Sequence, residues 1–461
     1  MTSGGGSRSL ADVARSSTSR RRGRERQPLP KGFGVIWTTV AIDLVGFGIV
    51  LPILPQYAQR FGASATTTGL LVASYSLAQF ALAPVWGRLS DRVGRKPVLI
   101  LALFGTAVGS LLTGLAGAIP LLFLGRLIDG GSGGSVSVAQ AAVADVAAPR
   151  DRARLMGLLG AAFGVGFVAG PAIVAVGALA GPRVPFYIAA AIAGVNAVVA
   201  IRRLPETHGP RAEVATVGPT PAADDRSALA AELELAGTLD GPQPGTPFDQ
   251  AERAASPTGE GGDAAPAVPG PGPGFDRSAI IRLLVVSFVG MVAFSGFEST
   301  FSLLTKDRFG LAEAGTGAVF TVIGLALVVV QVGVIGRVND RLGETGTLRF
   351  GLAANAVGLA VLAVDGGWAT LVPALALLVL GQGLLTPTLS SAIAGRAARA
   401  RGVWLGWQQS AGALARVAGP ILAGVLFQQV GVGAPYVVGA VLVLGALTFV
   451  PSVARSVTRP A

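Results

Sequence analysis

About a dozen long apolar runs divide this sequence, and they restrict its possible folds more than any other feature. Their approximate spans are 33–55, 67–86, 97–117, 119–144, 155–179, 185–203, 279–303, 313–335, 347–364, 369–394, 403–427 and 433–452. A membrane-spanning helix needs about 20 mostly apolar residues. Only 13% of the residues are charged, whereas in soluble domains the fraction is roughly a quarter. The sequence therefore predicts an all-α polytopic membrane protein rather than a soluble fold with buried core helices.

The positions of the basic residues predict how these spans are oriented. The formal net charge is +11 and the pI is near 11.1, but the 36 Lys and Arg residues gather mainly in alternate loops and in the two termini. The outer loops then hold only Arg60, Arg183, Lys306 and Arg308. Basic residues mark the cytoplasmic side, so we expect a cell (inner) membrane protein with both termini in the cytoplasm. Nucleic acid is a poor partner for scattered arginines without aromatic stacking platforms.

The sequence lacks the residue patterns of most enzymes. It contains no cysteine, which excludes disulfides, thiolate metal sites and cysteine nucleophiles. Its one histidine, His208, lies in a polar segment beyond a span, and we assign it no role. The glycine-rich GGSGG lacks the lysine and flanking strand of a phosphate loop. We therefore expect no enzyme, no metal and no cofactor, and a monomer that interacts with the lipid bilayer.

Composition divides the chain into two bundles. Residues 1–32 read as a disordered basic cytoplasmic tail and 453–461 as a second cytoplasmic tail. Residues 206–278 are rich in Pro, Gly, Ala, Asp and Thr, and such a segment cannot bury enough apolar surface to fold, which predicts a flexible cytoplasmic linker. The remaining ranges, 33–205 and 279–452, each contain six spans.

The two bundles are related by an internal repeat. The charged stretch GRLSDRVGRKP at 87–97 returns as GRVNDRLGETG at 336–346, about 249 residues later. The same shift relates three sets of landmarks: Gly87, Asp91, Arg92 and Gly94 to Gly336, Asp340, Arg341 and Gly343; Arg150, Arg152 and Gly157 to Arg399, Arg401 and Gly406; and Gly170-Pro171 to Gly419-Pro420. A constant shift across separate landmarks indicates two six-helix halves in parallel orientation, an arrangement in which transporters bind substrate near the midplane.

Several motifs resemble those of a known family. GRLSDRVGRKP, between spans two and three, resembles the loop signature of the major facilitator superfamily. RLIDGGSGG, with Arg126, Gly130 and Gly134, matches the family's fourth-helix pattern. GVGFVAGP, with Gly166, Gly170 and Pro171, matches the fifth-helix pattern of antiporters rather than that of sugar or peptide symporters. The resemblance implies the major facilitator fold, two six-helix bundles related by a parallel repeat.

Two further stretches narrow the resemblance to one branch. IDLVGFGIVLPILPQYA at 42–58 and LPET at 204–207 are similar to the tetracycline-efflux branch of the twelve-helix drug:proton antiporters. Two departures are visible. Val174 and Ala175 stand where the antiporter pattern usually has two glycines, and Asp129 stands where the family more often has a neutral polar residue.

Few ionisable residues lie within the spans, and each is a functional candidate because a mid-membrane charge costs roughly 2.5 to 3.5 kcal/mol. Asp43 is the first candidate for a proton site, since burial favours the protonated acid; the alternative is a carboxylate satisfied by structural hydrogen bonds. Arg126 and Asp129 share a helix face and can pair, either as a fixed pair or as a modulator and second proton site. Glu298 is a further proton or cation site, or only an interfacial acid. Arg416 receives no confident role.

The resemblance assigns a cytoplasmic latch to the repeated loop. Gly87 and Gly94 permit a tight reversal, and Arg95 is placed to pair with Asp91 or Asp145. In the family such a cluster holds the outward-open form; the alternative is an ordinary positive-inside loop. The latch candidates are Gly87, Asp91, Arg92, Gly94, Arg95 and Asp145.

The remaining candidates are helix breakers and polar or aromatic residues in the spans. Kinks with a role in gating, or simply close packing, are expected at Gly166, Gly170, Pro171, Gly419 and Pro420. Candidates for a substrate cavity are Tyr75, Gln79, Gln331, Gln382, Trp404, Trp407 and Gln408.

These features favour a proton-driven efflux antiporter for amphipathic small molecules or drugs, with a small-molecule substrate and the proton as partners. A transporter of the same fold with an endogenous metabolite, lipid or sugar as substrate stays open, although the antiporter-type fifth helix disfavours sugar symport. A transport-inactive scaffold is less consistent, because a scaffold has no need of charge inside the membrane.

Overall fold

A computed structural model describes residues 29–30, 32–147, 152–207, 276–397 and 401–451. The tail at 1–28, most of the expected linker (208–275, with His208) and the end of the chain from 452 lie outside these ranges, as do Arg150 and Arg399. The described residues form helices without strands. Within them, nine helices are long and apolar enough to cross a membrane.

The N-terminal half contains α2 (Phe33–Gln59), α3 (Ala65–Val93), α4 (Arg95–Leu115), α5 (Ile119–Ser132), α6 (Ser135–Val146), α7 (Arg152–Gly177) and α8 (Val184–Arg203). The C-terminal half contains α12 (Arg277–Phe309), α13 (Glu313–Val329), α14 (Ile335–Ala363), α15 (Trp368–Arg396), α16 (Arg401–Gln429) and α17 (Ala434–Ala446). Short 3-10 turns follow α7 (Ala178–Ala180) and α17 (Leu447–Phe449), and a π-helical turn, Val330–Val334, joins α13 to α14.

Local sequence explains where many helices begin and end. The Ser64 side chain caps α3 by accepting a hydrogen bond from the Thr67 backbone N–H, and Asp276 caps α12 in the same way through Ala279. Gly94, with φ of 101°, ends α3 and starts α4. Its repeat partner Gly343, with φ of 66°, makes a kink within α14. Both positions need glycine because other L-residues rarely adopt positive φ.

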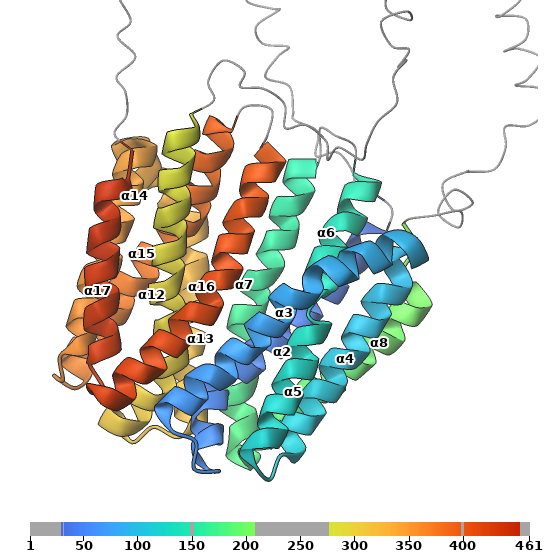
Figure 1. Ribbon diagram of the computed structural model, residues 1–461, viewed down its shortest axis with the longest axis horizontal. Helices are drawn as coiled ribbons and strands as arrows, with labels where there is room; N and C mark the ends of the chain where they lie inside the picture. The colour runs from blue at the N-terminus through green and yellow to red at the C-terminus, as the bar shows by residue number, and fades with distance from the viewer. Residues whose placement is uncertain (1–28, 31, 148–151, 208–275, 398–400, 452–461) are drawn as a thin grey trace, which may run out of the picture.

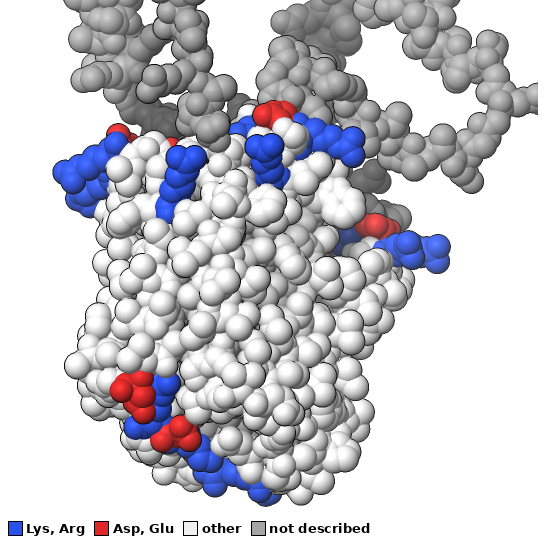
Figure 2. All heavy atoms as spheres, turned by 60° about the vertical axis from the view of Figure 1, so that its left-hand side comes forward, with Lys and Arg blue, Asp and Glu red and all other residues white. Residues whose placement is uncertain are grey.

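Each expected span contains a helix, although the last, 433–452, consists of the 13-residue α17 and the 3-10 turn that follows it. The expected span at 119–144 is two helices, α5 and α6, separated at Gly133 and Gly134. At the end of the expected linker, 206–278, α12 begins at Arg277. Charged side chains gather at the two ends of the bundle and leave an uncharged belt between them (Figure 2), as a bilayer-spanning surface requires.

The two halves lie side by side and pack mainly through three helix pairs. In Figure 1 the helices from α2 to α8 lie to the right and those from α12 to α17 to the left. Across the boundary α3 packs on α16, α7 on α13 and α2 on α12. We call the end at which α3 passes into α4 the linker end, and the end with the α2–α3 and α12–α13 connections the far end.

Glycines allow these helices to approach closely. A side chain at Gly170 of α7 would overlap the backbone of Gly48 on α2, and one at Gly419 of α16 would overlap α12. Between the halves, Gly317 of α13 faces Pro171 and Val174 of α7. This chain has valine at 174, where the antiporter pattern usually has glycine, and the small residue opposite it on α13, Gly317, keeps the two backbones close.

Candidate functional site

A break between α5 and α6 shapes the centre of the N-terminal half. The Gly131 and Gly133 carbonyls accept hydrogen bonds from Trp86 Nε1 (2.5 Å) and Gln79 Nε2 (2.9 Å) of α3. These bonds matter because an unsatisfied carbonyl inside a membrane costs several kcal/mol. Gln79 was expected to line a substrate cavity, but its amide donor is engaged here with backbone.

Arg126 and Asp129 form the expected ion pair on α5. Arg126 Nη1 lies 2.7 Å from Asp129 Oδ2, and both residues are buried. The Arg126 guanidinium also lies 4.3 Å from the centre of the Tyr75 ring on α3, a distance at which cation–π attraction operates. Thr106 of α4 lies close to the Asp129 carboxylate. The pair on α5 is therefore held by two neighbouring helices, α3 and α4.

Asp43 of α2 lies next to this pair. Its Oδ2 accepts a hydrogen bond from Ser135 Oγ at 2.5 Å, and Ser135 is the first residue of α6. Its other carboxylate oxygen, Oδ1, is buried without a partner among the described residues. Asp129 is within electrostatic range of Asp43. The break that separates α5 from α6 thus brings a hydroxyl donor to the acid of α2.

Glu298 and Arg416 extend the charged region into the C-terminal half. Glu298 on α12 is 8% exposed, and its Oε1 has no hydrogen-bond partner within the described ranges. Arg416 on α16 is within electrostatic range of both Glu298 and Tyr75. The five ionisable residues singled out from the spans therefore form one region across both halves, which we call the central charged cluster: Asp43, Arg126, Asp129, Glu298 and Arg416.

The central charged cluster is incompletely bonded. Asp43 Oδ1, Arg126 Nε and Glu298 Oε1 are buried polar atoms for which the described part of the chain supplies no partner. Such atoms are costly to leave unbonded, so the cluster has free capacity to take a proton, a water molecule or a polar group of a ligand. No group of three or more His, Cys, Asp or Glu side chains suited to a metal occurs among the described residues.

The latch candidates at the linker end form a hydrogen-bonded network. Arg95 Nη1 donates to Asp91 Oδ1 at 2.6 Å, and Arg95 Nε donates to Asp145 Oδ2 at 3.0 Å, so both pairings considered for Arg95 are present. Arg92 is exposed. Gly87 was expected to form the reversal with Gly94, but it lies inside α3 and only Gly94 turns the chain.

Sequence reasoning missed Glu206 as a member of this network. Its carboxylate accepts the backbone N–H groups of Arg95 (2.8 Å) and Lys96 (3.3 Å), the first residues of α4. A side chain at Gly94 would overlap the Glu206 carboxylate. The acid of the LPET stretch therefore caps a helix start, where negative charge is favourable. The sequence does show an acid, Glu206, directly after α8. The backbone groups that it caps are distant in sequence, so the sequence alone does not indicate the contact.

A seal of polar contacts joins the two halves at the far end. Gln56 Nε2 of α2 donates to the Ser302 carbonyl at 2.7 Å and to Thr316 Oγ1 at 3.0 Å. Arg60 Nη2 lies 2.8 Å from Glu313 Oε1. Because Gln56 is buried, with 2% of its surface exposed, its bonds are strong constraints on the helix positions. We call these residues the far-end seal.

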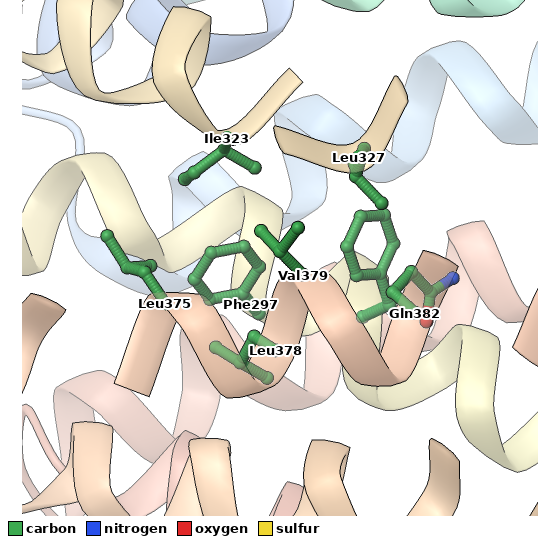
Figure 3. A pocket seen from close by; sticks show the side chains of 8 residues that line it. Phe297, Ile323, Leu327, Leu375, Leu378, Val379 and Gln382 are labelled. Atoms are coloured by element: carbon green, nitrogen blue, oxygen red, sulfur yellow. The ribbon is translucent and has the colours of Figure 1, made fainter. Parts of the chain in front are cut away.

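The other cavity candidates have different surroundings. Gln382 of α15 faces a cavity of about 10 Å³ inside the C-terminal half, lined by Phe294, Phe297, Ile323, Leu327, Leu375, Leu378 and Val379 (Figure 3). It also accepts a hydrogen bond from Asn355. Gln331 lies in the π-helical turn and is exposed. On α16, Trp404 and Gln408 are half-buried and Trp407 is 61% exposed. They do not gather around one pocket with Gln382.

Comparisons with known proteins agree with this architecture. The sequence profile of the Major Facilitator Superfamily matches residues 36–364 and 283–461. The chain belongs to the Major Facilitator Superfamily. It is a membrane transporter and not an enzyme.

Two relatives carry drug-resistance names. The chain is 26% identical to Multidrug resistance protein 2 of Bacillus subtilis, over 90% of this chain and 93% of that one. It is 30% identical to Tetracycline resistance protein, class B, of Escherichia coli, over 76% of each. The crystal structure of the human organic anion transporter MFSD10 (TETRAN) matches with a TM-score of 0.61 and 26% identity, over 91% of this chain and 99% of that one.

Proposed function

We propose that this transporter is a proton-coupled efflux antiporter that exports amphipathic small molecules or drugs by alternating access. The observation that carries the proposal is the Asp43 carboxylate, which is bonded to Ser135 on one oxygen and has a buried, unpartnered oxygen on the other. A proton on that oxygen satisfies it, and loss of the proton leaves a charge beside Asp129. Exchange of the proton for substrate then couples proton movement in one direction to substrate movement in the other.

The far-end seal supports alternating access. Its contacts hold the two halves together at one end, and substrate would reach the central charged cluster from the opposite, linker end while they are formed. We assign the far end to the outside, with both termini in the cytoplasm and a monomer as the transport unit. The helices α2 to α8 and the helices α12 to α17 act as the two moving bundles, and the segment between Glu206 and Arg277 connects them. The latch around Arg95 and the glycine-proline positions of α7 and α16 change their contacts as the bundles rock.

The energetics of such coupling are adequate. One proton moving through about 100 mV releases roughly 2.3 kcal/mol. At about 1.4 kcal/mol per decade, that energy sustains a substrate gradient of about fifty-fold. The drug-resistance names of two relatives favour drugs as substrates, and the organic anion transporter favours a metabolite anion as the second candidate.

The test uses proteoliposomes with an imposed pH gradient and a trapped pH dye. Lipophilic drugs, cations and anions are added to wild type and to Asp43→Asn, with Val292→Asn at the equivalent position of the C-terminal half as the matched control. We expect compound-dependent proton movement in wild type and in the control, and none in Asp43→Asn. Equal proton movement in Asp43→Asn would refute the assignment of Asp43, and its absence from wild type with every compound would refute drug:proton exchange.

A further inference from the structure

Glu298 on α12 and Arg416 on α16 carry opposite charges on two helices that pack together. Arg416 is within electrostatic range of Glu298, yet no hydrogen bond or salt bridge joins their side chains within the described residues. Arg126 and Asp129, in contrast, are joined at 2.7 Å. The C-terminal half therefore contributes an open pair to the central charged cluster, and the N-terminal half a closed one.

The position of Glu298 on α12 places it at the boundary between the halves. Ser295 lies three residues before it and Ser302 four residues after it, so all three share one face of the helix. The backbone at Gly419 of α16 packs beside Ser295, and the Ser302 carbonyl accepts Gln56 of α2. Glu298 therefore lies one helical turn from the far-end seal, on a helix that packs against both α16 and α2.

Glu298 and Arg416 differ in how far their hydrogen-bonding groups are satisfied. Glu298 is buried, and its Oε1 has no donor within the described part of the chain. Arg416 is only partly buried, so water can hydrate it. A buried carboxylate oxygen without a donor is more costly than a hydrated guanidinium. The group that gains most from an incoming ligand is therefore the acid, and the ligand group it accepts is a cation or another hydrogen-bond donor.

We infer that Glu298 and Arg416 select the substrate by charge: Glu298 binds the cationic group of an amphipathic substrate, and Arg416 competes with that group for the carboxylate. This inference rests on the proposed function, since it names the substrate class of that exporter. The other charges of the cluster are consistent with it. Arg126 and Asp129 neutralise each other, and Asp43 adds a second acid on the opposite half.

The competition makes opposite predictions for the two residues. Glu298→Gln removes the charge that attracts the cation, and the loss of one member of a buried charge pair weakens binding roughly tenfold or more. Arg416→Gln removes the competitor, so the same cation binds more tightly. Glu298→Asp keeps the charge and retains part of the affinity. Asp307→Asn, an exposed acid near the end of the same helix, leaves the affinity unchanged.

The experiment measures equilibrium binding of radiolabelled tetraphenylphosphonium to the full-length protein in lipid nanodiscs, without a proton gradient. Triphenylphosphine oxide serves as the neutral probe and should be insensitive to both substitutions. Size-exclusion profiles show that each variant is folded, and Arg416→Gln provides a gain of affinity that misfolding cannot produce. Because no gradient is applied, the result is independent of whether Asp43 couples transport to protons.

Any one of four results would overturn the inference. One is unchanged tetraphenylphosphonium affinity in Glu298→Gln. Another is a loss of affinity for both probes in Arg416→Gln, which would indicate a structural role. The third is the failure of folded wild-type protein to bind tetraphenylphosphonium at millimolar concentration. The fourth is binding of an anionic dye through Arg416, which would assign the open pair to anions.

Discussion

The two halves share one backbone plan but place different chemistry at equivalent positions. Shifted by about 249 residues, Arg126 and Asp129 become Leu375 and Leu378, which line the small cavity of the C-terminal half. The packing around them is otherwise alike: Gly109 faces Asp129 and Gly125, while Gly358 faces Leu378 and Ala374. The fold thus accepts either an ion pair or two leucines here, so the ion pair is not needed to form the helix contact.

The linker ends show a second difference. In the N-terminal half Arg95 pairs with Asp145, and in the C-terminal half Glu344, at the position equivalent to Arg95, pairs with Arg396. The charges are exchanged between the helices while the bridge is present in both halves. Bridging the residue that follows the turn or kink glycine to the linker end of a later helix is therefore the shared requirement, and the order of the signs is free.

The largest expected effect comes from making the N-terminal half resemble the C-terminal half. Arg126→Leu leaves Asp129 buried and unpaired, which costs about 3 to 5 kcal/mol. The double substitution with Asp129→Leu removes the unpaired charge and should regain most of the stability, because leucines fill the same place in the other half. Thermal unfolding in detergent measures both. A double variant no more stable than the single one would contradict the equivalence.

A transport assay on the same two variants separates an effect on function from an effect on folding. If the ion pair serves transport, the stable double variant should remain inactive in the proteoliposome assay. Leu378→Met in the cavity of the other half is the matched control and should stay active. A double variant that is both stable and active would show that Arg126 and Asp129 are structural only.

Glycine substitutions at the two turns should have unequal effects. Gly94→Ala and Gly343→Ala both place alanine at positive φ, which costs roughly 1 to 2 kcal/mol. Gly94→Ala should cost about a further 1 kcal/mol, because the new methyl group displaces Glu206 from the start of α4, whereas nothing lies within 4 Å of the equivalent point at Gly343. Thermal unfolding of the two variants gives the difference. Equal losses would rule out a capping role for Glu206.

The starts of the two halves should respond differently to acid. The pKa of Asp276 is held below its ordinary value because the Ala279 backbone N–H donates to the carboxylate. The N-cap residue of α2 is Gly32, which has no side chain to form such a bond. A lowered pKa means that the cap stabilises the protein above the ordinary carboxyl pKa, and that this stability is lost as pH falls through the lowered value. Asp276→Ala should cost about 1 kcal/mol at neutral pH and less in acid. A loss independent of pH would exclude the cap.

The smallest expected effect is exchange of the charges at Glu344 and Arg396. Both side chains are partly exposed, so either single reversal should cost about 1 kcal/mol or less. The double reversal, Glu344→Arg with Arg396→Glu, reproduces the sign order of the N-terminal half and should return to wild-type stability. A double-mutant cycle from unfolding midpoints measures the coupling. A double variant less stable than both single variants would show that the sign order matters.

The helices and their repeat could be predicted from sequence because length, apolarity and a constant shift are local patterns. The break between α5 and α6 could not, because hydropathy continues through Gly133 and Gly134 and only Gln79 and Trp86 of another helix make the break tolerable. The ionisable candidates were identified by their cost in a membrane, and the Arg126–Asp129 pair by its spacing. The surroundings of Gln382 and the bonding of Glu206 depend on tertiary contacts that spacing does not contain.

The break between α5 and α6 has a consequence for how the chain enters the membrane. A continuous helix can be inserted alone because its backbone is bonded internally. The segment from Ile119 to Val146 instead leaves the Gly131 and Gly133 carbonyls to side chains of α3. Its stable insertion therefore depends on a helix synthesised earlier, and we expect the ribosome-bound chain to retain α3 beside the translocon until α6 has emerged.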